Sequence, residues 1–338
     1  KLKVGLIGLN SDHLWPVWGR GVIKEVKESG KYELVAAADK NPPLLDRIKK
    51  EFGVQKTYGD YHDMLKKEKF DVAVIGCPNN EKADVIEAIA EHGIHALIDK
   101  TLSANLEQAD RIYRAAKKHK IKAVVYYTML FDAKSQECVK LAKDGTIGRV
   151  LQITSRVANS GPEHHGCTKY FLEWLFNKEK NGGGSIMDYC TYGGVYSRWI
   201  IGQPQGVMAV GGRYFKTNIE AEDTGAVLLR YPKALAILQG SWTEFASDTA
   251  GKVYPGPHLA VYGTEGAVIW RKTFDDTIAL VTADFPEGKV YKPVPPSDEL
   301  ADAPDYLAYC IEKDKPVEGG GSLEVCRDVQ EIIEAAYR

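Results

Sequence analysis

KLKVGLIGLNSDHLWP, residues 1–16, opens the chain as a short apolar strand that runs into Gly8. A parallel sheet that binds a dinucleotide begins in this way, because a glycine lets the chain turn tightly toward the first helix. Asn10 and His13 stand where a second and a third glycine are expected. Asparagine tolerates the left-handed backbone conformation better than most residues, so the turn can survive. Two interpretations stay open: a cofactor loop with altered glycines, or a turn with a purely structural role.

The rest of the first 125 residues repeats this alternation of strand and helix. Apolar residues at helical spacing predict helices over 82–93 and 105–120, and Gly93 ends the first of them. Short β-branched runs predict strands at residues 4–8, 33–39, 71–76, 95–100 and 122–127. We therefore expect a Rossmann domain, a doubly wound parallel sheet, over residues 1–125.

The pattern changes after Gly148, where strand-like runs mostly follow one another without intervening helices. The predicted strands cover residues 149–157, 206–215, 224–231, 234–242, 258–263 and 266–271. One strong helix is predicted from Ser185 to Ile201, and two more at 305–312 and 323–337. Residues 126–338 are thus expected to form an α+β domain with a large, mostly antiparallel sheet. This domain organisation allows the C-terminal helices to pack on the first domain.

Bulk composition points to a cytoplasmic globular protein. The 338 residues carry a formal net charge of -2, which gives no electrostatic case for nucleic acid or an anionic membrane as a partner. No run of about 18 apolar residues is present, so neither a membrane span nor a signal peptide is expected. The six cysteines form no C-x-x-C pair, which favours free thiols over disulfides or a zinc site.

Polar residues gather where the predicted parallel strands end, and ligands of such sheets bind beyond those ends. The candidate cofactor-binding residues are therefore Gly8, Asn10, His13, Asp39, Lys40, Pro78, Asn79 and Lys100. Asp39, after the second strand, suits a ribose diol and repels a 2′-phosphate, so NAD is the expected cofactor. Lys40 beside it weakens this discrimination, which leaves NADP as an alternative.

Four further segments match one known family in order and spacing. They are CPNNEKADVIEAIAEHGIHALIDKTL (77–102), LFDAKSQECVKLAKDGTIGRV (130–150), GGGSIMDYCTYGGVYSRWIIG (182–202) and LAVYGTEGAV (259–268). With the opening strand, they make the whole chain resemble the glucose–fructose oxidoreductase / inositol dehydrogenase / MocA (Gfo/Idh/MocA) family of NAD(P)-dependent oxidoreductases. The resemblance implies a nicotinamide cofactor and an enzyme that oxidises or reduces a small molecule.

The chain departs from the family pattern at places that bear on the substrate. The family's E-K-P triplet reads D-K-T at 99–101, so the lysine stays while the acid is shortened and the proline is lost. Its D-x-x-x-H pair reads Asp188 and Tyr192, and a tyrosine there is similar to the glucose–fructose oxidoreductase branch. The resemblance implies catalytic roles for Lys100, Asp188 and Tyr192. Tyr127 replaces a basic or amide residue often found after the fifth strand, and is expected to contact the substrate.

These residues suit alcohol oxidation, which needs a hydride acceptor and a group that handles the hydroxyl proton. Lys100 can hydrogen-bond the hydroxyl, while Asp188 holds the lysine or the substrate in place. Asp188 and Tyr192 are four residues apart and share one helix face. A neighbouring ammonium is expected to pull the pKa of the Tyr192 phenol below its usual value of about 10, which would make it a proton relay. The glycines at 182–184 are expected to let a substrate approach the start of the helix.

Each residue also has a plain structural interpretation. A lysine at a strand end is often a solvated surface charge. Asp188 is favoured in the first turn of a helix by the helix dipole. Tyr192 belongs to an aromatic stripe at helical spacing, with Tyr189 and Tyr196. The resemblance favours the catalytic interpretation of all three candidates.

Two adjacent histidines, His164 and His165, stand on a loop after the first strand of the second domain. Adjacent loop histidines rarely converge on one metal ion, and no partner residue at a fixed spacing is found, so no metal site is expected. We expect the two imidazoles instead to bind substrate hydroxyls, because their loop should lie near the helix that carries Asp188.

The leading hypothesis is an NAD(P)-dependent dehydrogenase that moves hydride between nicotinamide and a carbinol carbon of a sugar, polyol or glycoside. Residues 1–125 would bind the cofactor. Residues 126–338 would bind the substrate and form a homodimer or homotetramer, since a sheet with helices on one side leaves a second face to be masked. Two alternatives stay open: an NAD-dependent lyase or glycosidase that acts through a transient keto-sugar, and a non-catalytic protein that binds sugar or cofactor.

Overall fold

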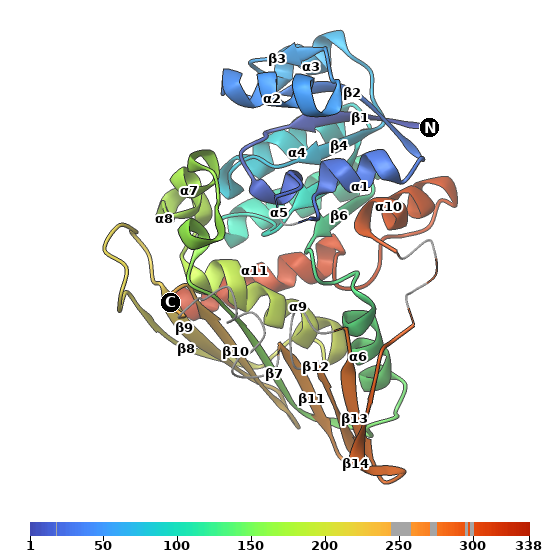
Figure 1. Ribbon diagram of the computed structural model, residues 1–338, viewed down its shortest axis with the longest axis vertical. Coiled ribbons are helices and arrows are strands. Elements are labelled where there is room, and N and C mark those ends of the chain that lie inside the picture. The colour runs from blue at the N-terminus through green and yellow to red at the C-terminus, as the bar shows by residue number, and fades with distance from the viewer. Residues whose placement is uncertain (18, 245–257, 271–275, 295–296, 298–300) are drawn as a thin grey trace.

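The computed structural model contains two sheets, one above the other in Figure 1, with helices around and between them. It describes residues 1–338 except 18, 245–257, 271–275, 295–296 and 298–300. Arg271, the last residue of one predicted strand, lies outside the described residues. The N-terminal part of the chain builds the upper sheet, and the later part builds the lower one.

The upper sheet is the predicted doubly wound parallel sheet. Its six strands lie in the order β3-β2-β1-β4-β5-β6, and every pairing is parallel. Their bounds are β1 Leu2–Ile7, β2 Tyr32–Ala38, β3 Thr57–Tyr58, β4 Val72–Ile75, β5 His95–Asp99 and β6 Ala123–Tyr126. The five predicted strands are confirmed, and the two-residue β3 is additional. The strand order reverses between β1 and β4, which makes the crevice beyond their carboxyl ends the expected ligand site.

Helices and short turns connect these strands. The helices are α1 Val22–Glu28, α2 Pro42–Phe52, α3 Tyr61–Lys67, α4 Lys82–Glu91 and α5 Leu106–His119, with the 3₁₀ turns η1 Asp12–Leu14 and η2 Asn79–Glu81. The two predicted helices, α4 and α5, are confirmed. Helix α5 begins where the side chain of Asn105 accepts a hydrogen bond from the backbone of Gln108 at 2.9 Å. Helix α4 is followed by Gly93 in the left-handed conformation, as its sequence predicts.

The lower sheet has eight strands in the order β14-β13-β12-β11-β7-β10-β9-β8. Their bounds are β7 Val150–Ala158, β8 Gly206–Gly212, β9 Thr224–Arg230, β10 Leu235–Ser241, β11 Leu259–Gly263, β12 Gly266–Trp270, β13 Ile278–Thr282 and β14 Phe285–Tyr291. Only β7 and β10 pair in parallel, so the sheet is mostly antiparallel as predicted. The six predicted strands are confirmed, and β13 and β14 extend the sheet beyond them.

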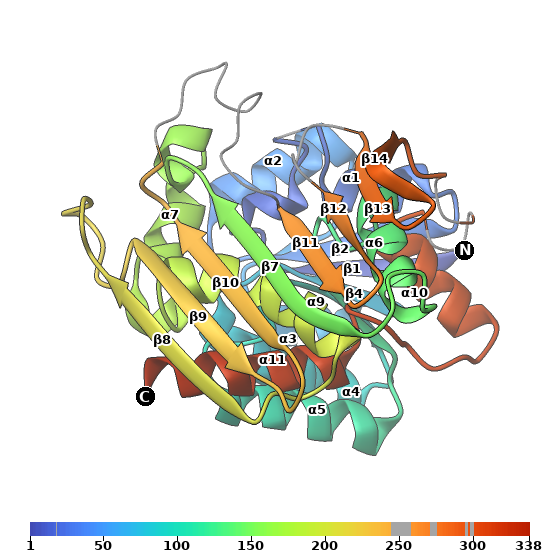
Figure 2. The ribbon, with the colours of Figure 1, turned by 90° about the horizontal axis from the view of Figure 1, so that it is seen from below.

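Helices cover one face of this sheet and leave the other open, as Figure 2 shows. The elements of this part are α6 Ala133–Lys143, α7 Lys169–Leu175, α8 Lys178–Asn181, α9 Thr191–Ile200, α10 Ala303–Glu312 and α11 Leu323–Tyr337, with the 3₁₀ turn η3 Pro162–His165 and the π turn η4 Ile186–Cys190. The predicted helix from Ser185 to Ile201 is confirmed, but it begins as the π turn η4 before it continues as α9. None of the helices in the described part of the chain is long and apolar enough to span a bilayer.

The C-terminal helices tie the two sheets together. Helix α10 packs on the first domain, where Leu307 and Ala308 join the same buried cluster as Val4. The Tyr32 hydroxyl also donates to the carbonyl oxygen of Pro304 at 2.6 Å. Helix α11 lies between the sheets and contacts both α5 and α9. A larger apolar cluster runs without interruption from the first domain into the second.

The three glycines before η4 allow close packing of the protein itself. They were expected to make room for a substrate, but the structure gives them another role. A Cβ at Gly182 would overlap the carbonyl oxygen of Ala104, and one at Gly184 would overlap that of Glu222. Gly183 faces the hydroxyl of Tyr337 in the same way. The segment is thus pressed between both domains, and this fixes the place where η4 starts.

Gly182→Ala should therefore destabilise the fold by about 1–3 kcal/mol or more, because a left-handed backbone and a steric overlap coincide there. Gly182 has φ +92°. Gly202→Ala is the matched control, since Gly202 has φ +110° but no atom within 4 Å of an added Cβ. Urea denaturation of both variants measures the difference. An equal loss in the two variants would show that the overlap contributes nothing.

Candidate active site

Lys100 and Asp188 form a buried ion pair that joins the two domains. Lys100 directly follows β5, Asp188 lies in η4, and Lys100 Nζ donates to Asp188 Oδ1. The two side chains are only 4% and 5% exposed. The other carboxylate oxygen, Oδ2, accepts a hydrogen bond from Trp242 Nε1 at 3.0 Å. The aspartate is therefore held at both oxygens, with one of them aimed at the lysine.

The ion pair keeps Lys100 protonated at neutral pH. Burial on its own lowers the pKa of the ammonium group, but attraction to Asp188, with smaller contributions from Tyr192 and Asp99, outweighs burial and raises the pKa above its ordinary value. Such a lysine can donate a hydrogen bond or a proton to an oxygen atom placed beside it. It can accept a proton only after it has lost its own.

Tyr192 lies beside the pair as a neutral phenol. The centroid of its ring is 5.6 Å from Lys100 Nζ, and its hydroxyl is 3.2 Å from Thr128 Oγ1. The expectation that Lys100 lowers the pKa of this phenol is wrong. Burial raises the pKa of Tyr192, and the opposing effect of Lys100 is smaller. Tyr192 offers a hydroxyl for hydrogen bonding and not a phenolate.

Tyr127 supports Tyr192 from behind. It is 1% exposed, and its ring meets that of Tyr192 edge to face at 5.0 Å between centroids. Burial raises the pKa of its phenol well above the usual value. The position expected to contact substrate is thus filled by a buried ring, whose influence reaches the site through Tyr192.

The loop after β1 keeps the shape of a nucleotide-binding turn despite its missing glycines. Gly8 has φ +74°, and a Cβ there would lie 2.5 Å from the backbone nitrogen of Cys77. Asp39 Oδ2 accepts a hydrogen bond from the backbone N–H of Leu9 at 2.6 Å, which ties the loop to the end of β2. Within the described part of the chain, the backbone N–H groups of Asn10 and Asp12 donate to no other residue. They are free for a ligand beyond the strand ends.

The side chain of His13 contacts Asp99, which is the first residue of the D-K-T triplet. Its Nδ1 is 3.0 Å from Asp99 Oδ1, and Ser11 Oγ donates to Asp99 Oδ2 at 2.6 Å. Burial alone raises the pKa of the Asp99 carboxyl, but His13, Lys82 and Ser11 together hold the pKa below its usual value. The acid next to Lys100 therefore fixes the cofactor loop, while the Lys100–Thr101 peptide bond that follows is cis.

Three other candidates for the cofactor site lie around the end of β4. Lys40 Nζ donates to Glu81 Oε1 at 2.6 Å, so its charge is already paired. Pro78 precedes η2. Asn79 is buried, and its amide donates to Thr101 Oγ1 at 2.9 Å and to Asn181 Oδ1 at 2.8 Å. Asn79 therefore connects the strand ends to α8 and does not present its amide to a ligand.

The η3 loop lies over the cofactor loop. The backbone N–H of Thr168 donates to Asp12 Oδ2 at 2.6 Å, and its hydroxyl donates to Oδ1 at 3.0 Å. His164 and His165 end η3 and are exposed. Burial raises the pKa of the neighbouring Cys167 thiol, and the charge of Asp12 raises it further. Among the described residues, no group of three His, Cys, Asp or Glu side chains is arranged to hold a metal ion.

Sequence reasoning missed four residues of this site. They are Lys82, Thr128, Asn181 and Trp242, which touch the candidates named above. Trp242 ends a predicted strand, and its sequence position indicates only an aromatic residue of the core. Lys82 stands in the first turn of a predicted helix, where the sequence indicates a solvated charge. Only the fold shows what they contact.

Two family models match the chain. One is described as "Oxidoreductase family, NAD-binding Rossmann fold" and covers residues 2–127. The other is described as "GFO/IDH/MocA C-terminal domain" and covers residues 135–269. The chain belongs to the GFO/IDH/MocA family. The resemblance deduced from the sequence is confirmed, and the parallel sheet is the NAD-binding domain of an oxidoreductase.

Relatives of this GFO/IDH/MocA protein include named dehydrogenases. Myo-inositol 2-dehydrogenase of Thermotoga maritima is 25% identical over 302 residues, which are 86% of this chain and 81% of that protein. D-xylose 1-dehydrogenase (NADP(+)) 2 of Haloferax volcanii is 24% identical over 279 residues, 76% of this chain and 81% of that one. The similarity extends over both domains in each case.

Solved structures share the fold of this GFO/IDH/MocA chain over its whole length. Levoglucosan dehydrogenase in complex with NADH and levoglucosan superposes with a TM-score of 0.82 at 19% identity, over 99% of this chain and 96% of that one. Aldose-aldose oxidoreductase from Caulobacter crescentus superposes with a TM-score of 0.80 at 22% identity, over 100% of this chain and 97% of that one. At these identities the likeness concerns the fold.

Asp188→Asn should destabilise the protein by about 3–5 kcal/mol, because Lys100 would keep a buried charge without a counter-ion. Adding Lys100→Met to this variant removes the charge, so the double variant should recover part of the loss. Urea denaturation of the three proteins gives the comparison. A single variant as stable as the unmodified protein would show that the pair is not desolvated in solution.

Proposed function

We propose that this oxidoreductase transfers hydride between NAD and a carbinol carbon of a sugar, polyol or glycoside. The observation that carries the proposal is the buried Lys100–Asp188 pair beyond the carboxyl end of β5, in an NAD-binding sheet. Relatives named for myo-inositol and D-xylose, and a structural neighbour holding NADH and levoglucosan, support this substrate class. In this proposal residues 1–125 bind the cofactor and residues 126–338 bind the substrate.

The edge of the parallel sheet fits a dinucleotide. The unpaired backbone N–H groups of Asn10 and Asp12 suit phosphate oxygens, and Gly8 supplies the left-handed turn that precedes them. Asp39 Oδ1 accepts two hydrogen bonds from Asn41, while Oδ2 accepts one from the backbone of Leu9 and keeps a lone pair for a ribose hydroxyl. We assign His13 and Pro78 to the same site by their places in the loops that follow β1 and β4, with Lys40 and Asn79 beside them. The nicotinamide of the bound cofactor supplies the hydride acceptor or donor.

Lys100 handles the proton of the reacting oxygen. In the reduction of a carbonyl group, its ammonium donates a proton to the oxygen while the carbon receives hydride. In the oxidation of an alcohol, the neutral amine of Lys100 accepts the hydroxyl proton. Asp188 holds the lysine in place in both directions. Tyr192, as a neutral phenol, hydrogen-bonds a hydroxyl next to the reacting carbon.

The remaining hydroxyls of the substrate are assigned to groups of the second domain. Thr128 shares a hydrogen bond with Tyr192 and is partly exposed. The exposed imidazoles of His164 and His165 would bind hydroxyls at the outer end of the substrate. Tyr127 contributes by fixing the ring of Tyr192.

Lys100→Met should lower turnover at least about 10²-fold, because it removes the group that transfers the proton while keeping most of the side-chain stem. A screen of sugars and polyols for NADH formation identifies the substrate first. Tyr192→Phe keeps the ring packing and should slow turnover less, with little change in stability. Near-normal turnover by Lys100→Met on a demonstrated substrate would place the reacting group elsewhere. Product formed without net NADH would point to redox-assisted elimination instead of dehydrogenation.

NAD should bind more tightly than NADP, because Asp39 repels a 2′-phosphate and the ammonium of Lys40 is engaged by Glu81. Fluorescence titration with both cofactors measures the preference. Glu81→Gln weakens the hold on Lys40, so this variant should bind NADP better than the unmodified protein does and leave NAD binding unchanged. Tighter binding of NADP than of NAD by the unmodified protein would overturn the role given to Asp39.

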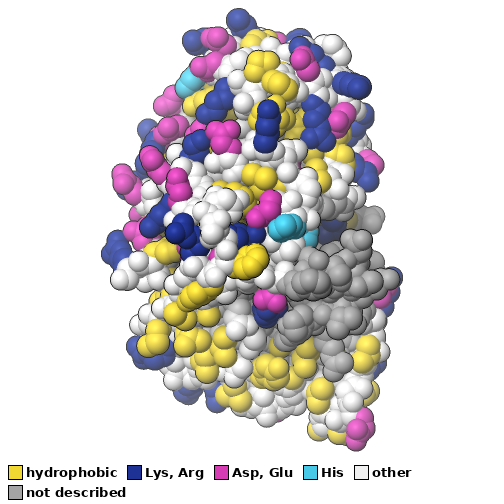
Figure 3. Space-filling view, turned by 60° about the vertical axis from the view of Figure 1, so that its left-hand side comes forward, with side chains coloured by type: hydrophobic (Ala, Val, Ile, Leu, Met, Phe, Trp, Pro, Cys, Tyr) yellow, Lys and Arg dark blue, Asp and Glu magenta, His cyan; other side chains and the backbone are white. Residues whose placement is uncertain are grey.

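We further propose that the open face of the lower sheet makes the protein a homodimer or homotetramer. Met208 and Val210 on β8 are 70% and 66% exposed, and Leu228 and Leu235 on the next strands are also exposed. On the face shown in Figure 3, hydrophobic side chains gather over the lower half and charged ones over the upper half. Such a surface is typical of an interface.

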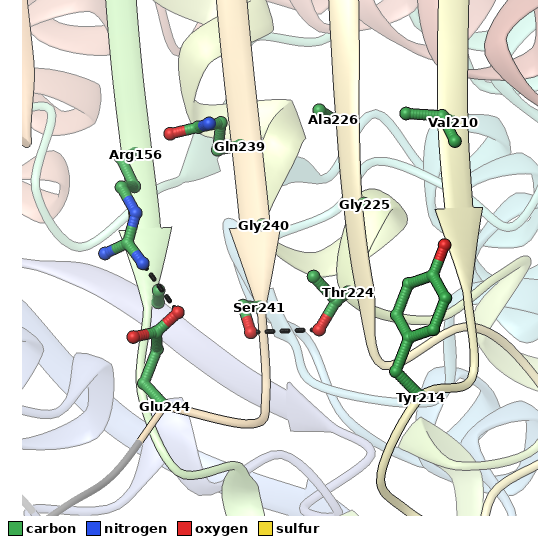
Figure 4. Close-up of a pocket in the computed structure, with 11 residues that line it drawn as sticks. Arg156, Val210, Tyr214, Thr224, Gly225, Ala226, Gln239, Gly240, Ser241 and Glu244 are labelled. Atoms are coloured by element: carbon green, nitrogen blue, oxygen red, sulfur yellow. Dashed lines mark hydrogen bonds and ion pairs between the residues drawn. The ribbon is translucent and has the colours of Figure 1, made fainter.

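A shallow pocket on the same sheet adds polar groups to this face, as Figure 4 shows. Arg156 and Glu244 form an ion pair of 2.6 Å on one side of it. Thr224 and Ser241 share a hydrogen bond of 3.0 Å in the middle of it, between that ion pair and Tyr214. Apolar side chains with hydrogen-bonding groups among them are the usual composition of a protein interface.

Light scattering at micromolar concentration should therefore report a dimer or tetramer. Val210→Glu should shift the protein toward monomers, since it buries a carboxylate in the proposed interface. Val294→Glu is the control, because Val294 is 86% exposed but lies outside the strands. A monomeric unmodified protein, or equal effects of the two variants, would contradict the proposed interface.

A reducing compartment, the cytoplasm, is proposed as the location. All six cysteines are free thiols, and five of them are buried. Free thiols of this kind persist where disulfides are kept reduced.

A further inference from the structure

Lys82 is a fully buried lysine whose charge meets only neutral acceptors. Its side chain, in the first turn of α4, has no exposed surface. The ammonium donates to Asn79 Oδ1 at 2.8 Å, to the carbonyl oxygen of Asp99 at 2.5 Å and to that of Thr101 at 2.6 Å. All three N–H donors of the group are used. An apolar side chain of similar length would leave these three buried acceptors without a donor.

Two of the three acceptors belong to the residues on either side of Lys100. A hydrogen bond to the carbonyl of Asp99 fixes the peptide group before Lys100, and one to the carbonyl of Thr101 fixes the chain just after it. Together they restrict the direction in which the Lys100 side chain leaves the backbone. Lys82 thus acts on the reacting group through its backbone, without touching it.

The third acceptor links the same ammonium to the segment that carries Asp188. Asn79, which accepts from Lys82, donates to Asn181 Oδ1 at 2.8 Å. The side chain of Asn181 donates in turn to the carbonyl oxygen of Gly183 at 2.7 Å, a few residues before η4. One buried network therefore holds the backbone of both partners in the Lys100–Asp188 pair.

Lys82 is also the member of this network that can lose a proton in a moderate pH range. Burial lowers the pKa of its ammonium to about 8, although Asp99 and Cys77 oppose the change, and the charge of Lys100 adds to it. Asp99 is already bonded to His13 and Ser11, so it does not approach Lys82 as a direct counter-ion. A neutral amine has two N–H donors for three oxygen acceptors, and so one of the three must be released.

We propose that Lys82 is a positioning residue that holds Lys100 in register with Asp188, and that loss of its proton loosens this hold. The proposal rests on the dehydrogenase activity proposed above. Lys100 by itself makes alcohol oxidation faster as the pH rises, because its neutral form is the base. Loosening at Lys82 opposes that rise, so the rate of oxidation should level off near pH 8.

Lys82→Met tests the proposal, since it keeps the stem and removes all three donors. With a substrate in hand, kcat for oxidation should fall about 10–100-fold, as expected when a reacting group is misplaced. The dissociation constant of NAD should stay within about twofold, because it is measured without substrate and depends on the loop after β1. The pH profile of kcat should rise steadily through pH 8, without the plateau of the unmodified enzyme.

Lys134→Met is the matched control, because Lys134 is also a buried lysine in the first turn of a helix, α6, and its ammonium pairs with Asp132 and lies over the ring of Trp270. It should lower stability but keep both kcat and the plateau. Unchanged kcat and an unchanged plateau in Lys82→Met would overturn the proposal. The proposal would also be overturned if Lys82→Met lost kcat but kept the plateau, and Lys134→Met showed the same loss.

A crystal structure of Lys82→Met separates this proposal from the proposed activity. If no sugar or polyol is oxidised by the unmodified protein, the dehydrogenase assignment fails, and the crystal structure still decides the role of Lys82. Displacement of Lys100 from Asp188 in that structure would support positioning. An undisturbed pair would overturn it.

Discussion

A positive charge buried in a protein needs a counter-ion, and here the two come from different domains. Lys100 leaves the end of β5, and Asp188 is delivered by η4 from the other side. Each ion alone would lose several kcal/mol of hydration without compensation. Each charge is therefore compensated only while the two domains stay docked. The close-packed glycines before η4 and the indole of Trp242 both hold Asp188 in place against Lys100.

The loop after β1 and the second domain are connected through the same few residues. Asp99 fixes the loop through His13 and Ser11, and the very next residue is Lys100. Asp12, in the loop itself, accepts both hydrogen bonds of Thr168 from the second domain. The loop after β1 is therefore tied to the residue that precedes Lys100 and to the second domain.

Most of the fold could be predicted because its strands are apolar runs bounded by polar ends, and its helices carry clear stop signals such as Gly93. Strand β14 could not, since Pro286 and Gly288 interrupt its pattern, and β3 is too short to show one. In the candidate site, motifs single out Lys100 and Asp188 as candidates, and the structure brings their two side chains together. The direction of the pKa shift of Tyr192 could not be predicted, because motifs name the charged residue beside it but do not show how deeply the phenol is buried. The partners of Lys82 are mostly backbone carbonyls, which no residue type encodes.

The core of the N-terminal sheet is closed by residues from the opposite end of the chain. Ala303 and Leu307 of α10 complete the cluster that contains Val4, and Tyr32 bonds to the backbone beside them. During synthesis, all six parallel strands leave the ribosome long before α10 exists. Until α10 has been synthesised, this domain is an open-faced intermediate with an uncovered apolar side. A chain that stops before α10 presents that surface to other proteins, so α10 protects the first domain against aggregation.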